Sequence, residues 1–129
     1  MTTLPLSPSS PFATRFLAWM KERFPFANAL LFFILYLTTA AVSRSTIDGA
    51  VSLSLQDLAG ALVTWSFFLV LRVFDEHKDY ELDCRNHPQR VLQSGLITLL
   101  HLRIAAAIAI ASQILWSVYL DGGIGQVTV

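Results

Sequence analysis

Residues 58–90 read LAGALVTWSFFLVLRVFDEHKDYELDCRNHPQR, an uncharged run followed directly by a strongly charged one. Residues 58–71 carry no charge, whereas residues 72–90 hold nine of the 18 charged residues of the chain. With its flanking residues the uncharged run reaches the roughly 20 residues that a membrane-spanning helix needs. This stretch therefore predicts a transmembrane helix that ends in a polar element, where any chemistry is expected.

The composition of the whole chain also favours a membrane protein. Of its 129 residues, 54% are hydrophobic and 14% are charged, whereas about a quarter of the residues in a soluble domain are charged. Nine basic residues balance nine acidic ones, which leaves no general basic surface for nucleic acid. The single cysteine, Cys84, excludes an intrachain disulfide. We expect an all-α integral membrane protein that binds no nucleic acid.

Three apolar segments are long enough to cross a bilayer. We place spans at about residues 26–43, 52–74 and 97–120, within a membrane region that covers residues 26–129. Residues 1–25 are expected to form a tail and a basic amphipathic interfacial helix, although an ordinary linker explains this segment equally well. A cleaved signal peptide competes with the first span, but the apolar run is longer than a signal core usually is.

The distribution of Lys and Arg predicts the orientation of the spans. Three basic residues precede the first span, one follows it, five lie between residues 72 and 103, and none follows the third span. Basic residues concentrate on the cytoplasmic side, so we expect the N-terminus and the Asp-rich loop, residues 75–95, in the cytoplasm. At the entry of the third span, His101 and Arg103 are expected to reach this interface, where Arg103 could contact a phosphate.

The polar element contains three aspartates, Asp75, Asp79 and Asp83, spaced four residues apart. A step of four residues turns a helix by about 40°, so the three carboxylates would project from one face and repel one another. Mg²⁺ would relieve the repulsion, since it prefers carboxylate oxygens and is commonly bound by one or two of them together with substrate phosphates. We therefore predict that all three aspartates are metal ligands.

Basic residues beside these acids favour a phosphate ligand. The residues that we predict to bind a diphosphate are Lys78, Arg90, Arg72 and Arg85. Carboxylates that hold a metal, next to cations that contact phosphate oxygens, are the combination that a diphosphate site needs. A solvated loop of i,i+4 ion pairs, such as Glu81 with Arg85, explains the same charges.

Residues 75–95 resemble the first aspartate-rich motif of the UbiA family of membrane prenyltransferases, which runs N-D-x-x-D-x-x-x-D and is followed by R-P-L-x-x-G. The matching residues are Asp79, Asp83, Arg90, Leu92 and Gly95. Asp75-Glu76 stands where Asn-Asp is usual, and Val91 replaces the proline. The order and spacing of the elements are kept across 21 residues and follow the second predicted span, as in the family.

The resemblance implies a helical bundle in which two Asp-rich motifs bind Mg²⁺ and a prenyl diphosphate, so that a prenyl group can be transferred to an acceptor. Family members have roughly nine membrane helices, which needs at least about twice this length. Beyond Asp83 the only acid is Asp121, so a second motif is missing from this sequence. We expect a truncated or partial enzyme, or a short form that works with further chains. The acceptor is unknown.

Other functions are compatible with parts of this pattern. A CDP-alcohol phosphotransferase also uses spaced aspartates and Mg²⁺, but its D-G-x-x-A-R opening is absent. A zinc site at His77, Cys84 and His87 lacks the usual paired spacing. The alternative from a different class is a small non-enzymatic membrane subunit that docks a partner through the charged cytoplasmic loop.

Overall fold

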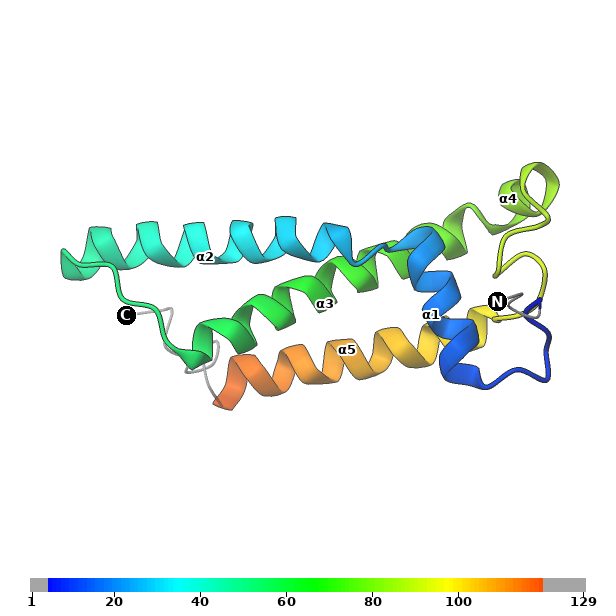
Figure 1. The fold of residues 1–129 in the computed structure, drawn as a ribbon. Helices are drawn as coiled ribbons and strands as arrows, with labels where there is room; N and C mark the ends of the chain where they lie inside the picture. Colours follow the sequence, from blue (N-terminus) through cyan, green and yellow to red (C-terminus); the bar gives the residue numbers. More distant parts are fainter. Residues whose placement is uncertain (1–4, 120–129) are drawn as a thin grey trace.

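The computed structural model describes residues 5–119, except for the side chain of Tyr119, and this part of the chain is entirely helical with no strand. The five helices are α1 (Phe12–Arg23), α2 (Ala27–Asp48), α3 (Leu55–Lys78), α4 (Tyr80–Asn86) and α5 (Leu99–Tyr119). Three long helices, α2, α3 and α5, run side by side, and the short α1 crosses them near one end (Figure 1). The predicted all-α fold is confirmed.

Helices α2, α3 and α5 are each long and apolar enough to cross a membrane, which confirms the three predicted spans. Each helix begins one to three residues after the predicted start of its span, and two helices continue beyond the predicted end. α2 continues past residue 43 to Asp48 and ends at Gly49, whose φ of 70° is a conformation that favours glycine. α3 continues past residue 74 to Lys78, so that part of the expected loop is helical.

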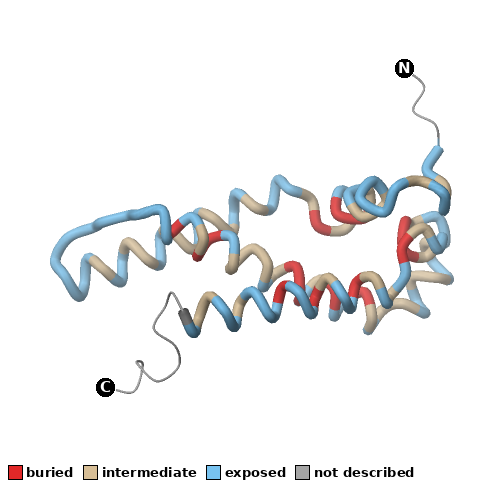
Figure 2. Tube along the Cα trace, turned by 90° about the horizontal axis from the view of Figure 1, so that it is seen from below, coloured by how far each residue is buried: buried red, intermediate tan, exposed pale blue. Residues whose placement is uncertain are grey.

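The segment that was expected to form either an interfacial helix or a linker is helical, as α1, and it packs onto the bundle. Its side chains Trp19 and Met20, with Phe24 just beyond its end, are buried in a cluster with Val73 of α3 and Leu102 of α5. Buried positions gather in the half of the molecule that α1 crosses, with a smaller group where α2 meets α3 (Figure 2). α1 therefore fixes the end of the bundle to which the Asp-rich segment belongs.

The contact between α2 and α3 depends on aromatic rings and on a glycine. The rings of Phe32 and Phe68 stack with their centroids 4.1 Å apart. At Gly60, an added Cβ would lie 2.2 Å from the hydroxyl oxygen of Tyr36. Only glycine allows this approach, because any other side chain would displace the tyrosine ring.

Arg44 and Asp57 close the bundle at the end opposite α4. The carboxylate of Asp57 accepts hydrogen bonds from Nη1 and Nη2 of Arg44, at 2.8 and 2.6 Å. The backbone N–H of Ser54 donates to Asp57 at 2.6 Å, within a capping box that begins α3. Arg44, the first residue of α2 beyond the predicted end of its span, thus has its partner within the same chain.

Candidate functional site

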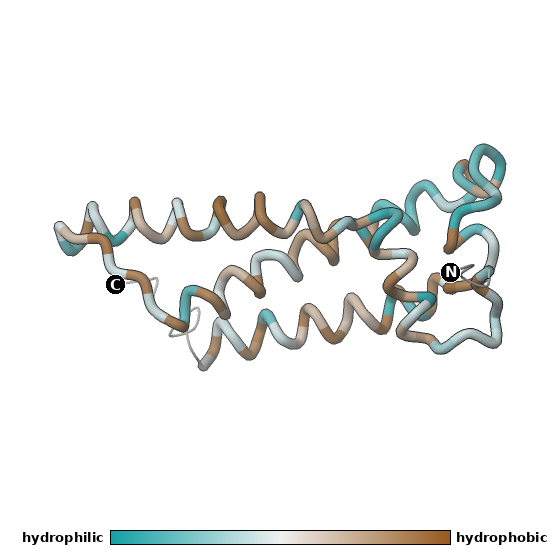
Figure 3. Tube along the Cα trace, viewed as in Figure 1, coloured by the Kyte–Doolittle hydropathy of each residue, from teal (hydrophilic) through white to brown (hydrophobic). Residues whose placement is uncertain are grey.

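Hydrophilic residues gather around α4 and the neighbouring ends of α1 and α3, while the long helices are mostly hydrophobic (Figure 3). We call this region the charged end; its residues are Arg23, Arg72, Asp75, Glu76, Lys78, Asp79, Asp83, Arg85 and Arg90. The backbone keeps the predicted register, because the N–H groups of Asp79 and Asp83 donate to the carbonyls of Asp75 and Asp79 at 2.9 Å. The break between α3 and α4 at Asp79 thus leaves the spacing of four intact.

Among the acids of the charged end, Glu76 and Asp83 are held by arginines from other helices or loops. Nε of Arg23 donates to Oε1 of Glu76 at 2.5 Å, and its Nη2 lies 3.6 Å from Oδ2 of Asp83. Nη1 of Arg90 lies 3.1 Å from the same Asp83 oxygen. Glu76 is fully buried, and its Oε2 has no hydrogen-bond partner in the part of the chain that the structure describes. Arg23 therefore ties α1 to both α3 and α4.

Burial lowers the pKa of Arg23, but the hydrogen bond and the negative charge of Glu76 more than offset this effect. Smaller attractions to Asp83 and Glu22 act in the same direction, and the pKa lies above its ordinary value. Arg23 therefore remains protonated at any pH at which the protein is studied.

The segment after α4 is fastened to α1 by its backbone. The N–H of Val91 donates to Oε1 of Glu22 at 3.2 Å, and Arg15 donates from Nη1 to the carbonyl of Leu96 at 2.9 Å. Leu92 is buried, and Gly95 has a φ of 82°, which a side chain would strain. The fold thus explains the leucine and the glycine of the R-V-L-x-x-G element, and Arg90 is its one charged residue.

The structure places the three predicted metal ligands in different surroundings. Asp75 is exposed, with Oδ2 3.7 Å from Nη1 of Arg72, whereas Asp79 is half-buried and Asp83 is engaged by arginines. Within residues 5–118, no three His, Cys, Asp or Glu side chains are close enough to one another to hold a metal ion. The donors fit a Mg²⁺ ion bound by one or two carboxylates and by phosphate oxygens, the mode that this ion commonly uses.

The two other predicted diphosphate ligands, Lys78 and Arg85, are exposed and form no ion pair with any acid that the structure describes. The expected i,i+4 pair between Glu81 and Arg85 is accordingly not formed among these residues. Asp121, the only acid after Asp83 in the sequence, lies outside the described residues. Two cations of the charged end are therefore available to an external anion.

A pocket of about 230 Å³ between α2 and α3 contains two of the predicted site residues. Its lining consists of Phe24, Asn28, Phe32, Phe68, Leu71, Arg72 and Asp75. Nε of Arg72 is buried and has no hydrogen-bond partner among the described residues. Along α3, the guanidinium and the carboxylate lie toward the charged end, and Phe68 lies one turn before Arg72 toward the middle of the helix.

Sequence reasoning missed three residues of this region. Glu76 could have been found from the sequence, because it stands at the position where the motif that residues 75–95 resemble usually has an aspartate. Arg23 and Asn28 had no such signal, because their contributions arise from the packing of helices that are separated in the sequence by about fifty residues. An arginine in a basic stretch and an asparagine near the start of a span look ordinary in the sequence.

Comparison with family models, curated proteins and solved structures found no match for this chain. The pocket between α2 and α3 combines a cation, a carboxylate and an amide with phenyl rings. Such a lining is complementary to an amphiphile that has an anionic head and an apolar tail.

Proposed function

We propose that the charged end binds the head of a prenyl diphosphate together with Mg²⁺, and that the protein takes part in prenyl transfer to an acceptor in the manner of the UbiA family, which residues 75–95 resemble. The observation that carries this proposal is the pocket between α2 and α3. Its Arg72, Asp75 and Asn28 suit an anionic head, and its Phe32 and Phe68 suit an isoprenoid tail.

In this proposal Asp75 and Asp79 hold the metal ion, since neither is engaged by Arg23 or Arg90, and the exposed Asp75 has only a 3.7 Å contact with Arg72. Mg²⁺ bound with the diphosphate would offset the negative charge that develops as the diphosphate leaves the allylic carbon. Asp83 acts through its arginine partners and would have to release them in order to reach the metal. The two carboxylates thus supply only part of an octahedral coordination shell.

The cations have separate tasks. Arg72 directs its unpartnered Nε–H and its remaining N–H groups to phosphate oxygens. Arg90 keeps one N–H on Asp83 and has others left for the diphosphate. Lys78 and Arg85, which are exposed, attract the ligand to this end. We further propose that this end faces the cytoplasm and that further chains contribute additional acids.

A second candidate function is a small membrane subunit that docks a partner through the charged end without catalysis. It is favoured by the pairing of Glu76 and Asp83 with arginines of the same chain, which leaves no group of three carboxylates among the described residues. The exposed Lys78 and Arg85 would then contact an acidic partner. Dependence on Mg²⁺ separates the two functions, because docking of this kind needs no metal.

The test is the binding of farnesyl diphosphate to the full chain in detergent, with and without Mg²⁺. We expect binding that requires Mg²⁺, is displaced by inorganic diphosphate, and is abolished by Asp79→Ala and by Asp75→Ala. Asp48→Ala is the matched control, since Asp48 is an exposed acid at the far end of α2 and should leave binding unchanged. Binding that survives Asp79→Ala, or that is the same without Mg²⁺, overturns the proposal and favours the docking subunit.

A further inference from the structure

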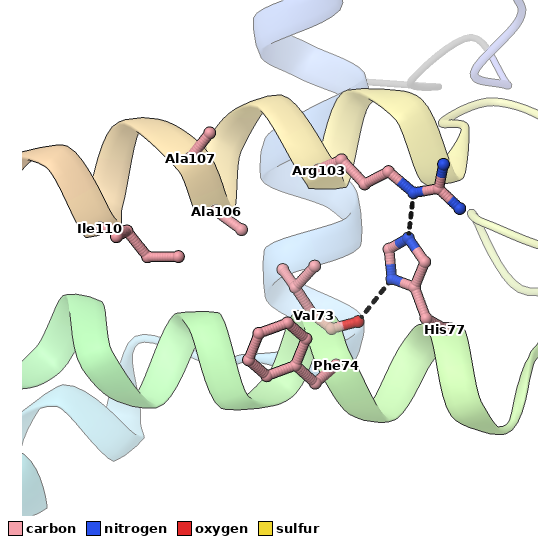
Figure 4. A pocket seen from close by; sticks show the side chains of 7 residues that line it. All are labelled: Val73, Phe74, His77, Arg103, Ala106, Ala107 and Ile110. Atoms are coloured by element: carbon pink, nitrogen blue, oxygen red, sulfur yellow. Dashed lines mark hydrogen bonds between the residues drawn. The ribbon is translucent and has the colours of Figure 1, made fainter.

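A second groove lies on another face of α3, where this helix packs against α5. Its volume is about 360 Å³, and its apolar lining residues are Val73, Phe74, Ala106, Ala107 and Ile110. Two polar side chains, His77 of α3 and Arg103 of α5, stand at the edge nearest the charged end (Figure 4). No acid lines this groove, in contrast to the pocket between α2 and α3.

Hydrogen bonds fix the two polar side chains in one arrangement. Nε of Arg103 lies 2.9 Å from Nε2 of His77, and Nδ1 of the same ring lies 2.8 Å from the carbonyl oxygen of Val73 (Figure 4). The arginine nitrogen can only donate, so Nε2 must accept. Nδ1 then carries the proton and donates a hydrogen bond to the carbonyl oxygen of Val73. The imidazole is therefore neutral in this arrangement, and it positions the guanidinium through Nε alone.

The rest of the guanidinium is available. Arg103 is exposed, and none of the acids in the described part of the chain lies within ion-pair distance of it. Its Nη1 and Nη2 groups offer a planar pair of donors, which suits two oxygens of a phosphate. An unpaired cation at the polar end of a membrane helix, beside an apolar groove, is complementary to a lipid whose head is anionic.

We propose that this groove binds an anionic phospholipid, with the phosphate on Arg103 and one acyl chain along Phe74, Ala107 and Ile110. A zwitterionic lipid offers the same chain but no net charge, so the groove should prefer phosphatidylglycerol to phosphatidylcholine. The site is independent of the prenyl diphosphate pocket, since the two share no lining residue. Either can fail without the other.

The test uses the full chain in phosphatidylcholine bilayers that contain a small fraction of spin-labelled phosphatidylglycerol or spin-labelled phosphatidylcholine. The motionally restricted fraction of each label gives its relative association with the protein. We expect a preference for phosphatidylglycerol that falls about fivefold in Arg103→Gln, the effect of one basic residue near an anionic surface. Lys21→Gln is the matched control, because it removes an exposed cation from α1, which lies outside this groove.

Lengthening the side chain of Ile110 provides a second test that keeps every charge. Ile110→Trp should fill part of the groove and reduce the association of both labelled lipids. Inorganic phosphate in solution should displace neither label. The proposal is overturned if Arg103→Gln and Lys21→Gln lower the preference equally, since the attraction would then be diffuse. It is also overturned if inorganic phosphate displaces the labelled phosphatidylglycerol, since the groove would then be a site for free anions.

Discussion

Helices α2 and α3 are neighbours of similar length, 22 and 24 residues, and both are apolar enough to span a membrane. They are nevertheless buried very differently. α2, which the structure describes in full, has no buried residue, whereas seven residues of α3 are buried, including Asp57 and Glu76. Apolar surface gives little drive for association in lipid, so length and hydropathy alone do not decide which helix organises the bundle.

α3 differs from α2 in that polar side chains near both of its ends pair with side chains of other helices. Asp57 pairs with Arg44 of α2, Glu76 pairs with Arg23 of α1, and His77 accepts from Arg103 of α5. Helices α1, α2 and α5 are thus each attached to α3 through at least one charged side chain. α3 is therefore the helix to which α1, α2 and α5 are all joined.

Arg23→Ala should have the largest effect on this arrangement. It leaves Glu76 buried without its partner, which costs about 3 kcal/mol or more in comparable buried pairs. We expect the chain in detergent to unfold at a clearly lower mole fraction of sodium dodecyl sulfate. Lys21→Ala, on the exposed face of α1, is the control. Equal unfolding midpoints for the two variants would mean that α3 is not held by its buried carboxylate.

Gly60→Ala should weaken the contact between α2 and α3 by about 1 to 3 kcal/mol, as overpacking commonly does. The added methyl group would overlap the ring of Tyr36, which must then turn away from Asp57. The same unfolding measurement checks this loss of stability. The Tyr36→Ala background is the control, because there the methyl group meets no ring and the extra destabilisation should vanish. A persistent effect in that background would contradict the close approach.

Arg44→Gln should have the smallest effect of the three, because Arg44 is 32% exposed and Arg23 only 20%, so that water replaces more of the pairing with Asp57 although both acids are buried. Salt sharpens the comparison between the two ends of α3. In about 1 M salt the contribution of Arg44 should shrink, whereas that of Arg23 to Glu76 should shrink less, because the less exposed pair is screened less. The difference in unfolding midpoint between wild type and each variant, measured at low and high salt, checks this. If high salt reduced the contribution of Arg23 more than that of Arg44, the Arg23–Glu76 pair would not be the better shielded of the two.

The sequence was sufficient for the fold class and for the three spans, because a predominantly apolar stretch of about 20 residues has few other structures open to it in a membrane. It also predicted the register of Asp75, Asp79 and Asp83, which depends only on helical geometry. It could not show that Arg23 would neutralise Glu76, or that Asn28 would line a pocket with Arg72. Those pairings depend on how separate helices pack, and local spacing carries no information about packing.

The most direct test of the central claim compares the two ends of α3 with a paramagnetic ion. Cys84, the single cysteine, lies in α4 at the charged end and can carry a trifluoromethyl label. A Cys84→Ser, Ser52→Cys variant carries the same label near Arg44, at the opposite end. With Mn²⁺ in place of Mg²⁺, we predict that the fluorine resonance at residue 84 broadens only when farnesyl diphosphate is also present, while that at residue 52 does not. Equal broadening at the two positions, or none at residue 84, would contradict a metal–diphosphate site at the charged end.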